Sequence, residues 1–231
     1  MYRTDVPGSM AHNIAGQVVQ GIELVRLAKD GDVLKVDVQP ERISLLGLPI
    51  QRAKEISAAR GFALTIDKDA GERIVVSQDP GTTLEVLAGK KAAVMTAPVD
   101  KVITIELDDT AAPASCAIFR KLTGLAEHDA GMLPVFMKYD DVVLFRPEIP
   151  KGTRINPENM PKEEAPAAGL AITNDSRKNA GLAGVRLSAN REFGPTSEPF
   201  EGTNMIGRVI DTDKLKKVRE RENVYIREVR R

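Results

Sequence analysis

One pattern of residues occurs at both ends of this chain, and this repeat constrains the architecture more than any single motif does. The sequence Asn-x-x-Gly-x-Val occupies residues 13–18 and again residues 204–209, an offset of 191 positions. Around it, residues 2–33 align without a gap onto residues 193–224. An internal repeat identifies a structural unit before any chemistry is considered. The second copy therefore closes a unit that begins near residue 100.

The first copy is expected to be the closing segment, residues 1–42, of a truncated unit, because only Met1 precedes it. The β-branched residues within 14–19 predict a strand. The apolar spacing within 22–27 predicts a short helix, and residues 33–38 predict the closing strand. Without the front half of their own unit, these elements are expected to pack on the other unit, on another copy of the chain or on a partner chain.

The middle of the chain, residues 43–99, predicts a small α/β module. Pro49 lies just inside the start of a helix that Gly61 ends. The sequence L-L-G-L-P before this helix, and V-x-Q-x-P-G-T-x-L-x-V-L-x-G at residues 76–89, resemble the PASTA module. The resemblance implies a folded spacer or docking unit, and we expect a spacer. Strands are expected at residues 62–66, 73–77, 83–87 and 91–96.

The main domain is expected at residues 100–231. Alternating apolar residues predict a strand at 102–107, and Pro113 starts a helix that Gly124 ends. The stretch 147–168 is rich in Pro, Glu and Lys, which is typical of a long surface loop. Further strands are expected at residues 139–145, 170–173 and 184–187.

Two motifs of the main domain and its repeat resemble cyclophilins. I-x-L at residues 105–107, followed by A-P-x-S at residues 112–115, resembles the opening strand and first helix of that family. H-x-x-x-G-x-V-V-x-G at residues 12–21 is similar to its closing segment. The expected fold class is therefore α+β. It comprises a cyclophilin-like β-barrel preceded by a small PASTA-like module and a partial repeat of the barrel's closing segment.

Three further stretches resemble the methanogenesis marker protein 3 family. They are T-N-D-S-R-K at residues 173–178, G-V-R-L-S at 184–188 and E-F-G-P-T-S-E-P-F-E-G-T-N at 192–204. Proteins of that family are archaeal and cyclophilin-like, occur in methanogens, and are tied to activation or maturation of methyl-coenzyme M reductase. The resemblance implies a cytoplasmic interaction subunit whose partner is methyl-coenzyme M reductase or its activation proteins. Members of the family are longer than this chain, in agreement with the missing front half.

Peptidyl-prolyl isomerisation is the alternative function. The enzyme must favour a twisted amide against a barrier of about 18–20 kcal/mol, with a donor such as Arg beside an apolar slot for the proline ring. Arg146 is at the position that matches the family's catalytic Arg, with Phe136, Met137 and Phe145 as candidate slot residues. Phe145 replaces the family's His, and Pro147 follows the Arg. These departures predict a surface arginine and a barrel without isomerase activity.

Two polar stretches form the candidate binding surface. Residues 193–200 carry two Phe and two Pro without helical or strand periodicity, and rigid loops of this kind often bind partners. Alternatively, the two Phe side chains plug the barrel ends and residues 204–207 form a turn. A third function, binding of a small anion or cofactor, would use residues 176–178. The candidate residues are Asn174, Asp175, Ser176, Arg177, Lys178, Phe193, Pro195, Thr196, Phe200 and Asn204.

Composition argues against several other classes of function. The 33 basic and 33 acidic residues cancel, so the net charge draws the chain neither to nucleic acid nor to a membrane surface. His12 and His128 have no second ligand at metal-binding spacing, so neither a metal nor a cofactor is expected. The single Cys116 fits a reducing cytoplasm and a place in the core. The acidic pairs 108–109 and 140–141 fit turns and caps.

Overall fold

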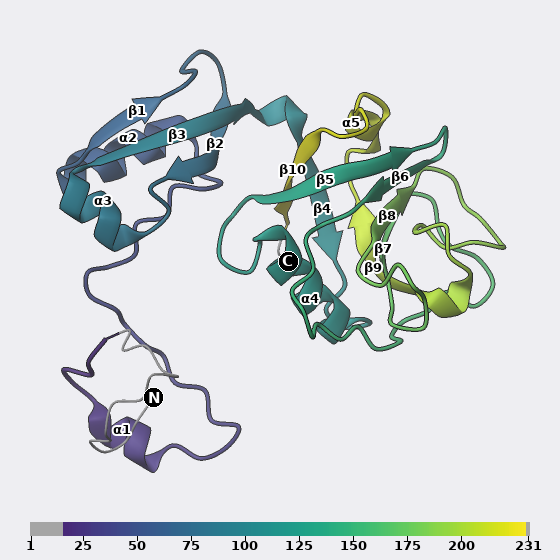
Figure 1. Cartoon of the computed structure of the whole chain (residues 1–231), viewed down its shortest axis with the longest axis horizontal. Helices are drawn as coiled ribbons and strands as arrows, with labels where there is room; N and C mark the ends of the chain where they lie inside the picture. The colour runs from purple at the N-terminus through teal and green to yellow at the C-terminus, as the bar shows by residue number, and fades with distance from the viewer. Residues whose placement is uncertain (1–15, 230–231) are drawn as a thin grey trace. The chain divides into compact units, whose positions relative to one another are not determined.

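The computed structural model describes residues 16–229 of the 231-residue chain (Figure 1). The chain separates into two compact units, residues 1–42 and residues 43–231, and each is described by itself. The second unit contains a three-stranded sheet followed by a closed barrel of seven strands.

In the first unit, the described residues form one short helix, α1 (Ile22–Leu27), as the apolar spacing predicted. It follows Gly21, whose φ of 80° suits glycine. The strand predicted at 33–38 is wrong, because these residues have no ladder partner among the described residues. A strand exists only where a neighbour accepts and donates its backbone hydrogen bonds. Residues 14 and 15 of the other predicted strand lie outside the described part of the chain.

The small sheet has the strand order β1-β3-β2, with β1 parallel and β2 antiparallel to β3. The strand predicted at residues 83–87 is instead a helix. Its start is capped by Thr82, whose hydroxyl accepts from Glu85 N at 3.4 Å, while Val86 faces the core. The elements are α2 (Ile50–Arg60), β1 (Ala63–Ile66), β2 (Arg73–Asp79), α3 (Thr83–Gly89) and β3 (Lys91–Pro98).

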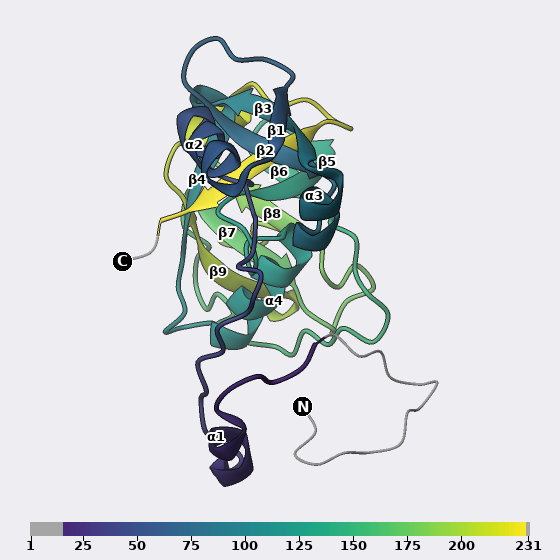
Figure 2. The ribbon, with the colours of Figure 1, turned by 90° about the vertical axis from the view of Figure 1, so that its left-hand side faces the viewer.

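The barrel confirms the predicted α+β class. Its strand order is β10-β4-β9-β7-β8-β6-β5, closed by the pairing of β10 with β5 (Figures 1 and 2). Helix α4 lies below the strands in both views. After the 3-10 turn η1 (Val99–Lys101), the elements are β4 (Val102–Leu107), α4 (Pro113–Thr123), β5 (Gly131–Lys138), β6 (Val142–Phe145), β7 (Gly169–Thr173), β8 (Ala183–Arg186), η2 (Phe200–Gly202), β9 (Thr203–Val209), α5 (Thr212–Lys216) and β10 (Asn223–Glu228).

The closing segment β9–α5–β10 seals this barrel. Strand β9 lies antiparallel to β4 and β7, and β10 lies parallel to β4 and antiparallel to β5. Gly207 makes the β9–β4 pairing sterically feasible, because a Cβ there would lie 2.0 Å from the carbonyl oxygen of Glu106. Inside, Phe119 and Cys116 of α4 pack with Phe145, Ile206 and the other buried strand residues.

Candidate functional site

The two candidate binding loops, which precede and follow β8 in the chain, form one structural element. The loop after β7 carries Asn174, whose side-chain amide donates to the Glu201 carbonyl at 3.0 Å. Ser176 Oγ donates to the same carbonyl at 3.3 Å, and Arg177 pairs with the Glu201 carboxylate. The stretch 174–178 is therefore fastened to the loop that leads into β9. We call residues 174–178 and 193–201 together the two-loop platform.

A buried amide network supports the platform from below. Asn204 Oδ1 accepts from Asn174 Nδ2 at 2.9 Å and from Glu158 N at 3.0 Å. Asn204 Nδ2 donates to Ser115 Oγ at 2.9 Å and to the Asn156 carbonyl at 2.8 Å. Both amides are fully buried. They therefore belong to the internal framework, and the prediction that they lie on the surface is wrong.

A second set of contacts holds the loop at residues 193–201 against strand β8. Pro195 passes directly over β8, and a Cβ on Gly184 would lie 2.2 Å from the Pro195 carbonyl oxygen. The hydroxyls of Thr196 and Thr203 are 2.9 Å apart and buried. Pro195 and Thr196, both candidate binding residues, thus hold the loop in place instead of facing solvent.

The exposed part of the platform is smaller than the sequence predicted. Phe193 is 37% exposed and Phe200 is half-buried, so Phe193 does not plug the barrel. Asp175, Ser176 and Lys178 of the other loop are exposed. Arg177 is half-buried and already pairs with Glu201, with Glu198 3.9 Å from its Nε. Its charge is therefore compensated, which disfavours anion binding here. The exposed platform residues are Asp175, Ser176, Lys178, Phe193, Ser197 and Glu201.

Arg146 lies at the end of β6, outside the barrel. Its guanidinium carbon is 3.5 Å from the centroid of the Phe136 ring, a cation–π contact. Phe136 and Met137 are half-buried nearby on β5. Phe145 points the other way, is 1% exposed and belongs to the barrel core. Phe145 therefore cannot line a slot for a proline ring, because neighbouring residues of a strand face opposite sides.

Three members of the apolar cluster beside Arg146 are closed to solvent. Val142, Leu144 and Leu182 pack there with Phe136 and Met137, and each of the first three is at most 5% exposed. A proline ring needs an accessible apolar surface on which to bind. Val142, Leu144 and Leu182 are too deeply buried to provide such a surface.

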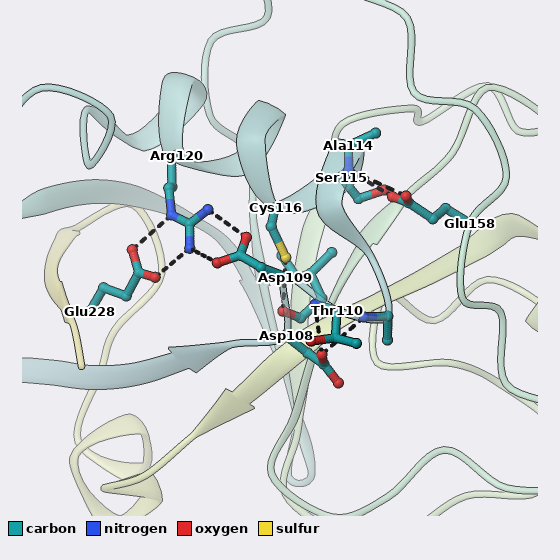
Figure 3. Close-up of polar contacts among 11 residues, drawn as sticks. Asp108, Asp109, Thr110, Ala114, Ser115, Cys116, Arg120, Glu158 and Glu228 are labelled. Atoms are coloured by element: carbon teal, nitrogen blue, oxygen red, sulfur yellow. Dashed lines mark hydrogen bonds and ion pairs between the residues drawn. The ribbon is translucent and has the colours of Figure 1, made fainter. Parts of the chain in front are cut away.

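The free backbone N–H groups at the start of α4 donate hydrogen bonds to a carboxylate from the long loop. Glu158 accepts from Ser115 N at 2.7 Å and from Ala114 N at 3.2 Å (Figure 3). Burial opposes ionisation of this carboxyl, but the hydrogen bonds from Ser115 and Ala114 outweigh burial and lower its pKa. The helix start is therefore occupied by the protein's own acid, and the long loop is anchored beside the amide network.

The remaining polar groups around α4 are structural. Arg120 pairs with Asp109 and Glu228, joining the helix to β10 (Figure 3). Asp108 caps a turn by accepting from Thr110 N at 3.2 Å, as predicted. Cys116 donates to the Ile206 carbonyl at 3.3 Å, and burial raises the pKa of its thiol to about 12. The predicted place of Cys116 in the core is confirmed.

Within residues 16–229, no three acidic, His or Cys side chains gather in a way that could hold a metal ion. His12 lies outside this range, and His128 Nδ1 lies 3.0 Å from Ser44 Oγ. The helices in the same range are all too short or too polar to cross a bilayer.

The barrel sequence matches a family profile described as "Putative peptidyl-prolyl cis-trans isomerase domain" over residues 103–229. The chain belongs to this family. The matched range contains both loops of the platform and the seven barrel strands, except Val102 at the start of β4. Together with the closed barrel, the match supports the expected cyclophilin-like fold.

Curated relatives come from methanogenic archaea and are named UPF0288 protein. The one of Methanosarcina barkeri is 41% identical over 98% of this chain and 44% of its own length. Those of Methanopyrus kandleri and Methanothermobacter thermautotrophicus are 38% and 37% identical over the whole chain. The chain spans less than half the length of these relatives. The chain also resembles a solved structure of a conserved Enterococcus faecalis protein over 55% of this chain and 29% of that one, at 18% identity and a TM-score of 0.35.

Proposed function

We propose that this chain is a protein-interaction subunit in methanogens and that it acts as an accessory factor in activation or maturation of methyl-coenzyme M reductase. The resemblance of the two platform loops to the methanogenesis marker protein 3 family supports the choice of partner. The methanogen relatives at 37–41% identity support the biological setting.

The two-loop platform is the observation that carries this proposal. Asn174 and Asn204 hold its loops rigidly from within, so little conformational entropy is lost when a partner binds. The platform also exposes the aromatic ring of Phe193 and the cationic side chain of Lys178. An aromatic anchor with charged neighbours is a common centre of protein interfaces.

The test is binding of purified methyl-coenzyme M reductase, and separately of its activation proteins, to the chain. Phe193→Ala and Lys178→Glu should each weaken binding at least about tenfold while leaving the far-ultraviolet circular dichroism unchanged. The matched controls are Tyr139→Ala, an exposed aromatic outside the platform, and Lys162→Glu in the long loop. Equal affinity of all four variants, or no binding by the unmodified chain, would reject the proposal.

Prolyl isomerase activity is the second candidate, and the position of Arg146 favours it. No carboxylate among the described residues forms an ion pair with this exposed guanidinium, which leaves its N–H groups available to a peptide carbonyl. The burial of Val142, Leu144 and Leu182 beside it argues against catalysis. An isomerisation assay on a prolyl peptide decides the matter. Activity that Arg146→Ala abolishes and Arg146→Lys only partly restores would establish the enzyme.

A further inference from the structure

Residues 16–38 carry the apolar pattern of β9–α5–β10 but do not bury it. Leu24 corresponds to Leu215 in the repeat and is 63% exposed, whereas Leu215 is 1% exposed. Val33 corresponds to Val224, and the two are 96% and 6% exposed. In the barrel, these positions face the core. Within its own unit, the segment therefore presents side chains that match the inside of a barrel, and that unit supplies no barrel to bury them.

The repeat also retains a steric requirement. Gly207 must lack a side chain because Glu106 of the paired strand approaches its Cα so closely. A Cβ on its counterpart Gly16 would meet no atom within 4 Å, so nothing within its own unit requires glycine there. A glycine at this position suits a strand that will be approached by another strand.

The pairing of β9 and β10 defines what the segment lacks. These strands bond to β4, β5 and β7, and all three come earlier in the chain than the closing segment. The counterpart of β10, residues 33–38, therefore needs one parallel and one antiparallel neighbour. The counterpart of β9, residues 16–18 in the described part, needs two antiparallel neighbours.

We propose that residues 16–38 dock as the closing strand–helix–strand of a second cyclophilin-like barrel, whose other strands lie on polypeptide outside residues 16–231. A second copy of this chain is a poor acceptor, because its barrel is already closed by its own tethered β9–α5–β10. The curated relatives have more than half of their length outside the match, which is ample for the missing strands.

Amide hydrogen exchange on the full-length Methanosarcina barkeri protein tests this docking. Peptides aligned with residues 22–38 should exchange as slowly, within about tenfold, as peptides aligned with residues 213–229, because both would be strands and helices of closed barrels. In the isolated chain of 231 residues, residues 22–38 should exchange at least about a hundredfold faster than residues 213–229. Fast exchange of the aligned segment in the full-length protein overturns the proposal.

Two further outcomes identify other occupants and would also overturn it. Protection of residues 22–38 in the isolated chain that grows with protein concentration would show that a second copy covers the segment. Protection there at every concentration would show that residues 43–231 cover it.

A pair of substitutions distinguishes loss of docking from a general loss of stability as the cause of fast exchange. Ala at the position aligned with Gly16 in the full-length relative should restore fast exchange to the segment aligned with 22–38, since a Cβ there would collide with the acceptor strand. Ala at the position aligned with Gly81, where a Cβ would meet open space in this chain, is the control and should change nothing. Unchanged protection with the first substitution counts against a β9-like pairing.

Discussion

The side-chain amide of Asn204 donates to the hydroxyl of Ser115 across 89 positions of sequence, at 2.9 Å. This bond joins the beginning of β9 to the start of α4, deep inside the protein. Because Asn204 also receives hydrogen bonds from Asn174 and from the backbone of Glu158, one residue connects a strand, a helix, the loop after β7 and the long loop at 147–168. The stability of the platform therefore depends on this amide.

Asn204→Ala should destabilise the protein by about 2–4 kcal/mol, because it leaves several buried donors and acceptors without partners. Urea denaturation of the full chain measures this change. Asn156→Ala is the control, because only the backbone carbonyl of Asn156 takes part in the network and its side chain is exposed. A loss below about 0.5 kcal/mol for Asn204→Ala would show that water replaces the amide without cost.

Gly207→Ala should be severely destabilising, by about 3 kcal/mol or more, because its Cβ would overlap the Glu106 carbonyl in the β4–β9 ladder. Gly16→Ala, at the matching position of the repeat, should leave the stability of the isolated chain within about 0.5 kcal/mol. Thermal unfolding of both variants measures the difference. Equal effects would contradict the contrast between the two copies of the repeat.

Glu158→Gln should cost about 1 kcal/mol near neutral pH, because the carboxylate at the start of α4 is lost. Since folding lowers the pKa of Glu158, its ionised form stabilises the protein above the unfolded value of about 4.5, and this contribution disappears as pH falls through the folded pKa. Denaturation at several pH values should therefore show the wild type and the variant converging in acid. Glu163→Gln, on the exposed part of the same loop, is the control.

Cys116 should resist alkylation by iodoacetamide in the folded chain. With its pKa raised to about 12, only about one thiol in ten thousand is ionised at pH 8, and the side chain is also buried. Labelling in denaturant should be at least about a thousandfold faster, and mass spectrometry can follow both reactions. Similar rates in the two conditions would show that α4 opens readily.

Local sequence was sufficient to predict a helix or strand where the segment itself contains the residues that begin it and end it, or the apolar spacing typical of it. Pro113 and Gly124 bracketed α4, and the alternation at 102–107 identified β4. Local sequence was not sufficient where pairing with distant strands determines the secondary structure. Strand β5 was missed because Pro134, a residue that normally marks a strand edge, lies within it. The same strand has a bulge between Val135 and Met137.

The sequence by itself determined the repeat, the barrel class and the two loops that carry the candidate binding surface. Tertiary structure alone decided which residues of those loops face outward, because Asn174 and Asn204 are polar in sequence but buried as hydrogen-bonded partners. The tertiary structure likewise decided that Phe145 lies in the core and that Leu24 and Val33 are exposed. Periodicity reports which side chains share a face of an element. Only the packing of distant elements determines whether that face meets water or another part of the protein.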